Sequence, residues 1–113
     1  MRLFHDFYQK VDRHYKSKRF VSEYARELLV TANYLNEVIK QVTGHPASYH
    51  ISQRVIQEAK RQALYSDANM KMVAYSLGFI DPAHFSRFFR RGAGINFSEF
   101  RRGVYNRPHN AAF

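Results

Sequence analysis

The chain has 113 residues, enough for one folded domain or two small subdomains and too few for a catalytic domain joined to a regulatory one. Eighteen Lys and Arg against nine Asp and Glu give a net charge of +9, which favours a polyanionic partner without identifying it. Since cysteine is absent, disulfides, thiolate metal sites and cysteine catalysis are excluded.

The first part of the chain predicts three helices, because apolar residues recur there at a spacing of three and four residues. The segment 16–19 ends the first helix. Ser22 is expected to cap a short second helix, and Thr31 to cap a third that stops at Gly44. The buried faces are expected to hold Phe4, Phe7, Tyr8, Val11 and Tyr15, then Tyr24, Ala25, Leu28 and Leu29, then Leu35, Val38, Ile39 and Val42.

A long fourth helix is predicted from Pro46 to about Tyr65, since proline suits a first helical turn. Its length would be about 30 Å at 1.5 Å per residue. Its apolar stripe is Ile51, Val55, Ala59 and Ala63, flanked by Ile56 and Leu64.

The second half of the chain predicts three further helices after a turn at 66–69. Asn69 is expected to cap a short fifth helix that Gly78 stops, and Asp81 with Pro82 to begin a sixth. Gly92 and Gly94 are expected to break the sixth helix, and Ser98 to begin a brief seventh with Glu99 and Phe100. The expected apolar faces are Met72, Val73, Ala74 and Leu77, then Phe85, Phe88 and Phe89.

The chain repeats itself, with an offset of 49 residues before the tight turn and 50 residues after it. This change indicates one residue inserted in the second turn, within 79–81. Each copy has a short helix, a tight turn and a longer helix, which is the pattern of a helix-turn-helix unit. The corresponding residues are Ala25, Leu28, Leu35, Val38, Ile39, Lys40, Gly44 and Ser48 in the first copy, and Ala74, Leu77, Phe85, Phe88, Phe89, Arg90, Gly94 and Ser98 in the second.

Each longer helix has a polar side opposite its apolar side, and its residues suit DNA. Arg pairs with guanine, Asn with adenine and Glu with cytosine, while small residues fit thymine methyls. For Arg87, the leading base-reading residue, a phosphate contact or an ion pair with Asp81 or Glu99 stays open. The predicted base-reading residues are Asn33, Asn36, Glu37, Ala83, Ser86 and Arg87, and the predicted phosphate contacts are Thr31, Tyr34, Lys40, His84, Arg90 and Arg91. For Tyr34 and His84, half-buried packing stays open as an alternative.

At these residues the chain resembles the DNA-binding domain of the AraC/XylS family of bacterial transcription regulators, over about 21–102. The more specific match is the run 73–91, continued from Gly94 to 98–102. Departures from the family pattern are Leu29 where Gly is frequent, Ala93 in place of a bulkier residue, and Asn96 with Phe97 in place of Ser-Pro. The looser matches in the first unit and connecting helix are Ala25, Leu28, Tyr34, Leu35, Lys40, Thr43, Gly44, Ile51 and the segment 58–61.

The resemblance implies an all-α, homeodomain-like fold of seven helices, with two helix-turn-helix subdomains joined by a long helix. The third and sixth helices are then the recognition elements. Since most family members also carry an effector-binding or dimerisation domain, a missing N-terminal domain is expected, the alternative being a stand-alone regulator. The expected divisions are a junction helix at 1–19, helix-turn-helix units at 20–45 and 67–105, a linker helix at 46–66, and a flexible tail at 106–113.

We therefore predict a sequence-specific binder of double-stranded DNA that regulates transcription in the cytoplasm. An enzyme, a cofactor, a metal site and a membrane partner are not expected, because no catalytic or phosphate-loop motif, metal-ligand spacing or long apolar run is present. Two alternatives stay open: a module that binds a protein such as RNA polymerase through the same helix faces, and a non-specific nucleic-acid binder.

Overall fold

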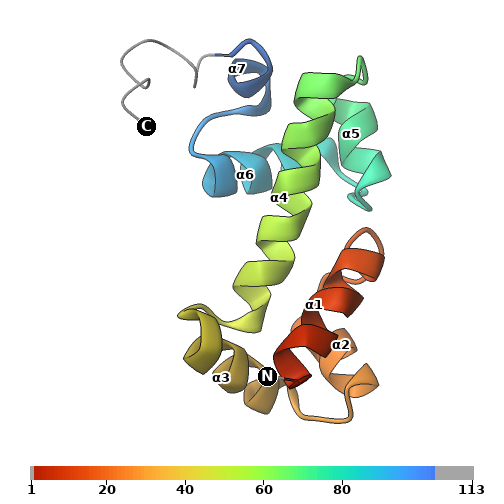
Figure 1. Cartoon of the computed structure of the whole chain (residues 1–113). Helices are drawn as coiled ribbons and strands as arrows, with labels where there is room; N and C mark the ends of the chain where they lie inside the picture. The colour runs from red at the N-terminus through yellow and green to blue at the C-terminus, as the bar shows by residue number, and fades with distance from the viewer. Residues whose placement is uncertain (1, 104–113) are drawn as a thin grey trace. The chain divides into compact units, whose positions relative to one another are not determined.

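The computed structural model describes residues 2–103 of the chain, and its regular elements there are all helices (Figure 1). The chain folds as two compact units, with the boundary between Val55 and Ile56. The predicted tail at 106–113 lies outside the described residues. Within them the helices are α1 (Arg2–His14), α2 (Val21–Glu27), α3 (Ala32–Thr43), α4 (Ala47–Tyr65), α5 (Met70–Ser76), α6 (Pro82–Ala93) and α7 (Phe97–Arg101). The predicted all-α fold with two helix-turn-helix subdomains is confirmed.

In the first unit α1, α2 and α3 pack around one apolar core. Phe7 and Tyr24 are wholly buried, and their rings meet edge to face with centroids 5.8 Å apart. The Tyr24 hydroxyl donates to the Lys18 carbonyl oxygen at 2.8 Å, and burial raises the pKa of Tyr24 to about 12. Because Phe7 and Val11 lie in this core, α1 is part of the packing that holds α2 and α3.

The core of the second unit is aromatic. Phe89 lies between Phe97 and Phe100, with ring centroids 5.4 and 5.8 Å away. Arg101, in α7, donates from Nε to the Ala63 carbonyl oxygen at 2.9 Å and from Nη2 to two further carbonyls at the same end of α4. The side chain thus satisfies carbonyl groups that the end of a helix leaves without intrahelical partners.

Several predicted helix caps are confirmed. Thr31 Oγ1 accepts from the Tyr34 amide at 3.0 Å, and Asn69 Oδ1 accepts from the Met72 amide at 2.8 Å. Asp81 caps α6 in the same way with Pro82 as its first residue, and Gly44 and Gly94 end α3 and α6 in the left-handed conformation.

Three predicted helix starts are wrong by one or two residues. Ser22 lies inside α2, whose N-cap is Phe20; the Glu23 carboxylate accepts from the backbone amides there, which replaces a side-chain cap. Asn96 caps α7 ahead of Ser98, and forms a capping box with Glu99. Pro46 precedes α4, which begins at Ala47.

Gly92 does not break α6, which continues to Ala93. A Cβ added at Gly92 would lie 2.8 Å from Cδ1 and Cγ1 of Ile56, so this glycine permits a close approach between α6 and α4 within the second unit. Some residues expected on buried faces are instead exposed, because the packed stripe of each helix is narrower than its apolar pattern and, for Leu29, because α2 ends before it. These are Tyr8, Leu29, Val42, Leu64 and Met72, while Phe88 is half-buried.

Candidate nucleic-acid interface

In the first unit α3 presents a polar face to solvent while its opposite face is fixed in the core. Leu35 and Ile39 are fully buried and Val38 nearly so, and α2 packs against them. Because the buried stripe repeats every 3.6 residues, the side chains between its members face outward. The predicted site residues exposed on or beside α3 are Thr31, Asn33, Tyr34, Glu37 and Lys40.

Asn36 differs from the other predicted residues of α3. It is half-buried, and its Oδ1 accepts a hydrogen bond from the Ser48 backbone amide at 3.3 Å. Ser48 lies in the first turn of α4, so this contact joins the middle of α3 to the start of α4. Since a bidentate pair with adenine needs both ends of the amide, one of those ends is already engaged.

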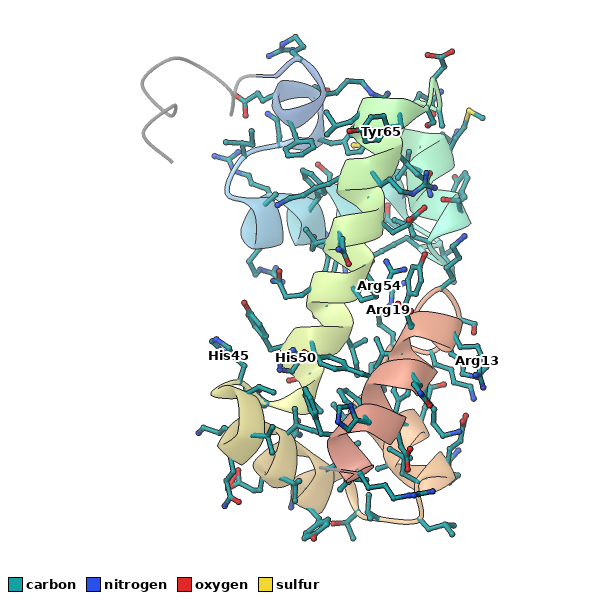
Figure 2. The ribbon with its side chains drawn as sticks, in the orientation of Figure 1. Arg13, Arg19, His45, His50, Arg54 and Tyr65 are labelled. Atoms are coloured by element: carbon teal, nitrogen blue, oxygen red, sulfur yellow. The ribbon has the colours of Figure 1, made fainter. Side chains whose placement is uncertain are left out.

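The C-terminal end of α3 is held by a polar network around His50, which Figure 2 labels near the start of α4. His50 Nε2 lies 2.8 Å from Thr43 Oγ1, and His50 Nδ1 lies 2.8 Å from the Tyr8 hydroxyl. Burial, followed by the nearby His45, lowers the pKa of His50 below its ordinary value. One imidazole therefore joins α1, α3 and α4 inside the first unit.

In the second unit α6 has the same length and the same division into buried and exposed faces as α3. Phe85 and Phe89 are fully buried, and α5 packs against α6. His84 is exposed, although its ring meets Phe79 edge to face at a centroid distance of 5.3 Å. Ser86, at the position of Asn36 in the repeat, is half-buried. The predicted site residues exposed on α6 are Ala83, His84, Arg87, Arg90 and Arg91.

The three arginines of α6 form no ion pair and no side-chain hydrogen bond within residues 2–103. The two acids that the sequence offers to Arg87 both cap helices: Asp81 accepts from the Ala83 amide at 2.9 Å, and Glu99 accepts from the Asn96 amide at 3.2 Å. The ion pair that the sequence left open for Arg87 is therefore not formed, and its guanidinium lies in solvent.

The two exposed faces differ in charge although the helices beneath them match. Along α3 the only charged residues are Glu37 and Lys40, which cancel, whereas α6 has three arginines and no acid. One residue of the first face is absent from the sequence-based prediction: Gln41 is exposed on α3 at the position that Arg91 occupies on α6. The constant offset of 50 residues would have identified it.

Among the described residues, no group of three or more His, Asp or Glu side chains lies close enough to hold a metal ion. His45 and His50, which flank Pro46 in the sequence, have ring centroids 6.3 Å apart, and the His45 ring stacks on Tyr49. No helix within 2–103 is long and apolar enough to cross a membrane.

The family model of the helix-turn-helix domain matches residues 24–103. The HTH-type transcriptional regulator YisR of Bacillus subtilis is 29% identical over 91 residues, which are 80% of this chain and 32% of YisR. The chain thus spans about a third of the length of the curated relatives that it matches.

Two solved structures show the same fold. The C-terminal domain of AraT, a response regulator from Geobacillus stearothermophilus, superposes with a TM-score of 0.83 at 22% identity, covering 89% of this chain and 84% of that domain. The DNA-binding domain of the transcriptional factor AdpA, solved in complex with a target DNA, has a TM-score of 0.79 at 19% identity, covering 94% of this chain and 96% of that domain.

Proposed function

This chain belongs to the AraC-type family of helix-turn-helix domains, which bind specific DNA sequences in transcription regulators, and we propose on this premise that α3 and α6 both read one duplex site. The family is one of DNA-binding domains and not of enzymes. The observation that carries the proposal is the repeat: two 12-residue helices with matched caps and matched buried stripes expose polar faces. A helix-turn-helix unit uses that face of its second helix in the major groove.

For base reading, the proposal relies most on Arg87, since its guanidinium is exposed at the middle of α6. It would grip O6 and N7 of guanine. Glu37 occupies the same position on α3 and would accept from N4 of cytosine while disfavouring other bases. Asn33 would pair with adenine, and Ala83 would contact a thymine methyl. Asn36 and Ser86, both half-buried, stay in the proposed set at the edge of each face.

For the DNA backbone, the proposed contacts are cationic, hydroxyl and imidazole side chains on or beside the same two helices. These contacts give affinity that does not depend on sequence, and each phosphate neutralised on B-DNA makes the slope of log affinity against log salt more negative by about 0.9. Binding should therefore weaken steeply with salt, as the net charge of +9 suggests. The proposed residues are Thr31, Tyr34, Lys40, His84, Arg90 and Arg91.

Selection of bound duplexes from a random pool tests the proposal. Two short enriched blocks about one helical turn apart are expected if both units enter successive major grooves. One block would mean that a single unit reads bases. If no sequence is enriched, the proposal is wrong: binding without a motif indicates a non-specific binder, and no binding points to a protein partner such as RNA polymerase. The cytoplasm, where bacterial DNA lies, is the proposed place of action.

Replacing Arg87 separates base reading from phosphate contact. Arg87→Ala should weaken binding to the selected site by about 1 to 3 kcal/mol and relax preference at one base pair. The matched control is Arg13→Ala, because Arg13 is an exposed arginine on α1, away from both reading helices in the sequence. An equal loss on random DNA would assign Arg87 to phosphate.

A further inference from the structure

The two most exposed of the large apolar side chains in the described residues lie in the two helix-turn-helix turns. Leu29 is 91% exposed and Ile80 is 92% exposed, while Tyr65, the next in order, is 79% exposed. Single exposed apolar residues are common on protein surfaces and need no explanation. Both lie in the turn that precedes the longer helix of a unit, although not at equivalent positions, and this common placement indicates a shared use.

Backbone hydrogen bonds align the two turns. The Val30 amide donates to the Ala25 carbonyl oxygen, and the Phe79 amide donates to the Ala74 carbonyl oxygen, both at 3.0 Å. Val30 and Phe79 are therefore equivalent, and Ile80 is the residue that the second turn has in addition. Ile80 lies directly before the N-cap of α6. Its side chain packs against almost nothing in the described part of this chain.

Leu29 adds an independent observation, because its backbone is strained. Its φ of 59° makes it the one residue other than glycine with a positive φ in 2–103, and the equivalent position of the second unit is Gly78, with a φ of 88°. The left-handed conformation is unfavourable for a residue with a Cβ, and glycine avoids that penalty. Because the Leu29 side chain is exposed, packing within this chain does not offset the strain. Strain of this kind is concentrated at functional positions.

Each of the two side chains lies just before the N-terminus of a helix that is proposed to enter the major groove. Leu29 lies two residues before Thr31, the N-cap of α3, and Ile80 lies one residue before Asp81, the N-cap of α6. A recognition helix approaches the major groove with its N-terminal residues, so the preceding turn faces the sugar-phosphate wall of that groove. At α6 the Asp81 carboxylate disfavours a phosphate, and an apolar contact is the interaction that this turn offers.

We propose that Leu29 and Ile80 each pack against deoxyribose rings at the wall of the groove that the following helix enters. The inference rests on the proposed function, and it means that apolar contacts made by these two turns contribute to the affinity for DNA. Such a contact buries aliphatic surface on the sugar and neutralises no phosphate, so it adds affinity without adding to the salt dependence.

Leu29→Gly and Ile80→Ser test the proposal on a duplex recovered by selection. Each variant should bind about threefold to tenfold more weakly, in proportion to the apolar surface no longer buried, with an unchanged slope of log affinity against log salt. Leu29→Gly should at the same time have a melting temperature equal to or above that of the unsubstituted chain, because it relieves the strained φ. Reduced binding by a variant of undiminished stability cannot come from unfolding.

A second variant and a control complete the test. Leu29→Asn keeps a residue that tolerates the left-handed conformation while removing the aliphatic group, so it should bind as weakly as Leu29→Gly. Met72→Ser removes an apolar side chain that is 57% exposed on α5, outside both turns, and should bind like the unsubstituted chain.

The inference is overturned if both turn variants bind like the unsubstituted chain, or if their binding changes only through a smaller salt slope. Either result leaves the proposed function intact, provided that the unsubstituted chain still prefers the selected site over random DNA. If the unsubstituted chain shows no such preference, the proposed function itself fails, so the two failures are distinguishable.

Discussion

The helices α3 and α6 match in length, caps and buried stripe, but their exposed faces differ in charge. Both have 12 residues, a side-chain cap at the start and a left-handed glycine at the end, and both bury an apolar stripe. Their exposed faces differ, since Glu37 on α3 occupies the position that Arg87 fills on α6. The buried half of each unit is thus constrained by packing, whereas the exposed half is free to diverge. On the proposed function, we therefore expect α6 to supply more of the electrostatic affinity, while Glu37 on α3 disfavours wrong sites.

We expect the largest effect from substituting a residue of the buried stripe, because the folded state depends on it. Phe89→Ala removes a fully buried ring that contacts Phe85, Phe97 and Phe100, and should lower the free energy of unfolding by about 3 to 5 kcal/mol. Chemical denaturation followed by circular dichroism measures it. The exposed Tyr75→Ala on α5 is the control and should change stability by less than about 0.5 kcal/mol. A loss at Phe89 as small as at Tyr75 would mean that the aromatic core does not hold α6.

The next largest effect tests the difference in charge between the exposed faces of α3 and α6. Arg87→Glu should weaken binding to the selected site by about 3 kcal/mol, because a cation is lost and an anion is placed near phosphate. The converse change, Glu37→Arg, should strengthen binding to random DNA and reduce preference for the selected site. Fluorescence anisotropy at several salt concentrations measures both. If Glu37→Arg leaves the ratio of specific to random binding unchanged, α3 has no discriminating role.

A smaller effect on stability is expected to differ between α3 and α6 at one pair of equivalent positions. Val42 on α3 and Gly92 on α6 are equivalent in the repeat, yet Val42 is 47% exposed and Gly92 lies against Ile56. Gly92→Ala should destabilise the second unit by about 1 to 3 kcal/mol, since the added Cβ would meet the Ile56 side chain at 2.8 Å. Val42→Ala should have little effect. Thermal unfolding compares the two, and equal small shifts would show that Ile56 moves aside.

The smallest expected effect is a pH dependence of stability that arises from His50 in the first unit. Since the pKa of His50 is lowered in the fold, the neutral imidazole is the favoured form, and the unfolded chain binds a proton at higher pH than the folded chain does. The stabilisation is fully present above the ordinary pKa of His50 and is lost as the pH falls through the folded pKa. His50→Gln should therefore flatten the stability measured between about pH 7 and about pH 5, on either side of the ordinary imidazole pKa of about 6.5.

A control keeps this result interpretable. His14 also has a lowered pKa, with burial and then Lys18 as the causes, so His14→Gln should be measured beside it. Among the described residues the His14 ring makes no hydrogen bond to another helix, unlike the His50 ring with Tyr8 and Thr43, so His14→Gln should leave the stability at neutral pH unchanged. An unaltered pH profile in His50→Gln would assign the dependence to other groups.

The helices, the repeat and most of the outward-facing residues could be predicted from the amino-acid sequence. Helical periodicity and cap chemistry are local properties, so Thr31, Asn69 and Asp81 could be identified as caps from the residues that follow them. The same periodicity separated the buried Leu35 and Phe85 from the exposed Glu37 and Arg87.

How residues distant in the sequence meet was evident only from the folded chain. There α1 completes the first core, Gly92 makes room for Ile56, and Asn36 is engaged by the start of α4. Leu29 likewise holds a left-handed backbone with its side chain in solvent. These facts depend on packing between elements, which sets burial and backbone conformation after the local pattern has set the helices.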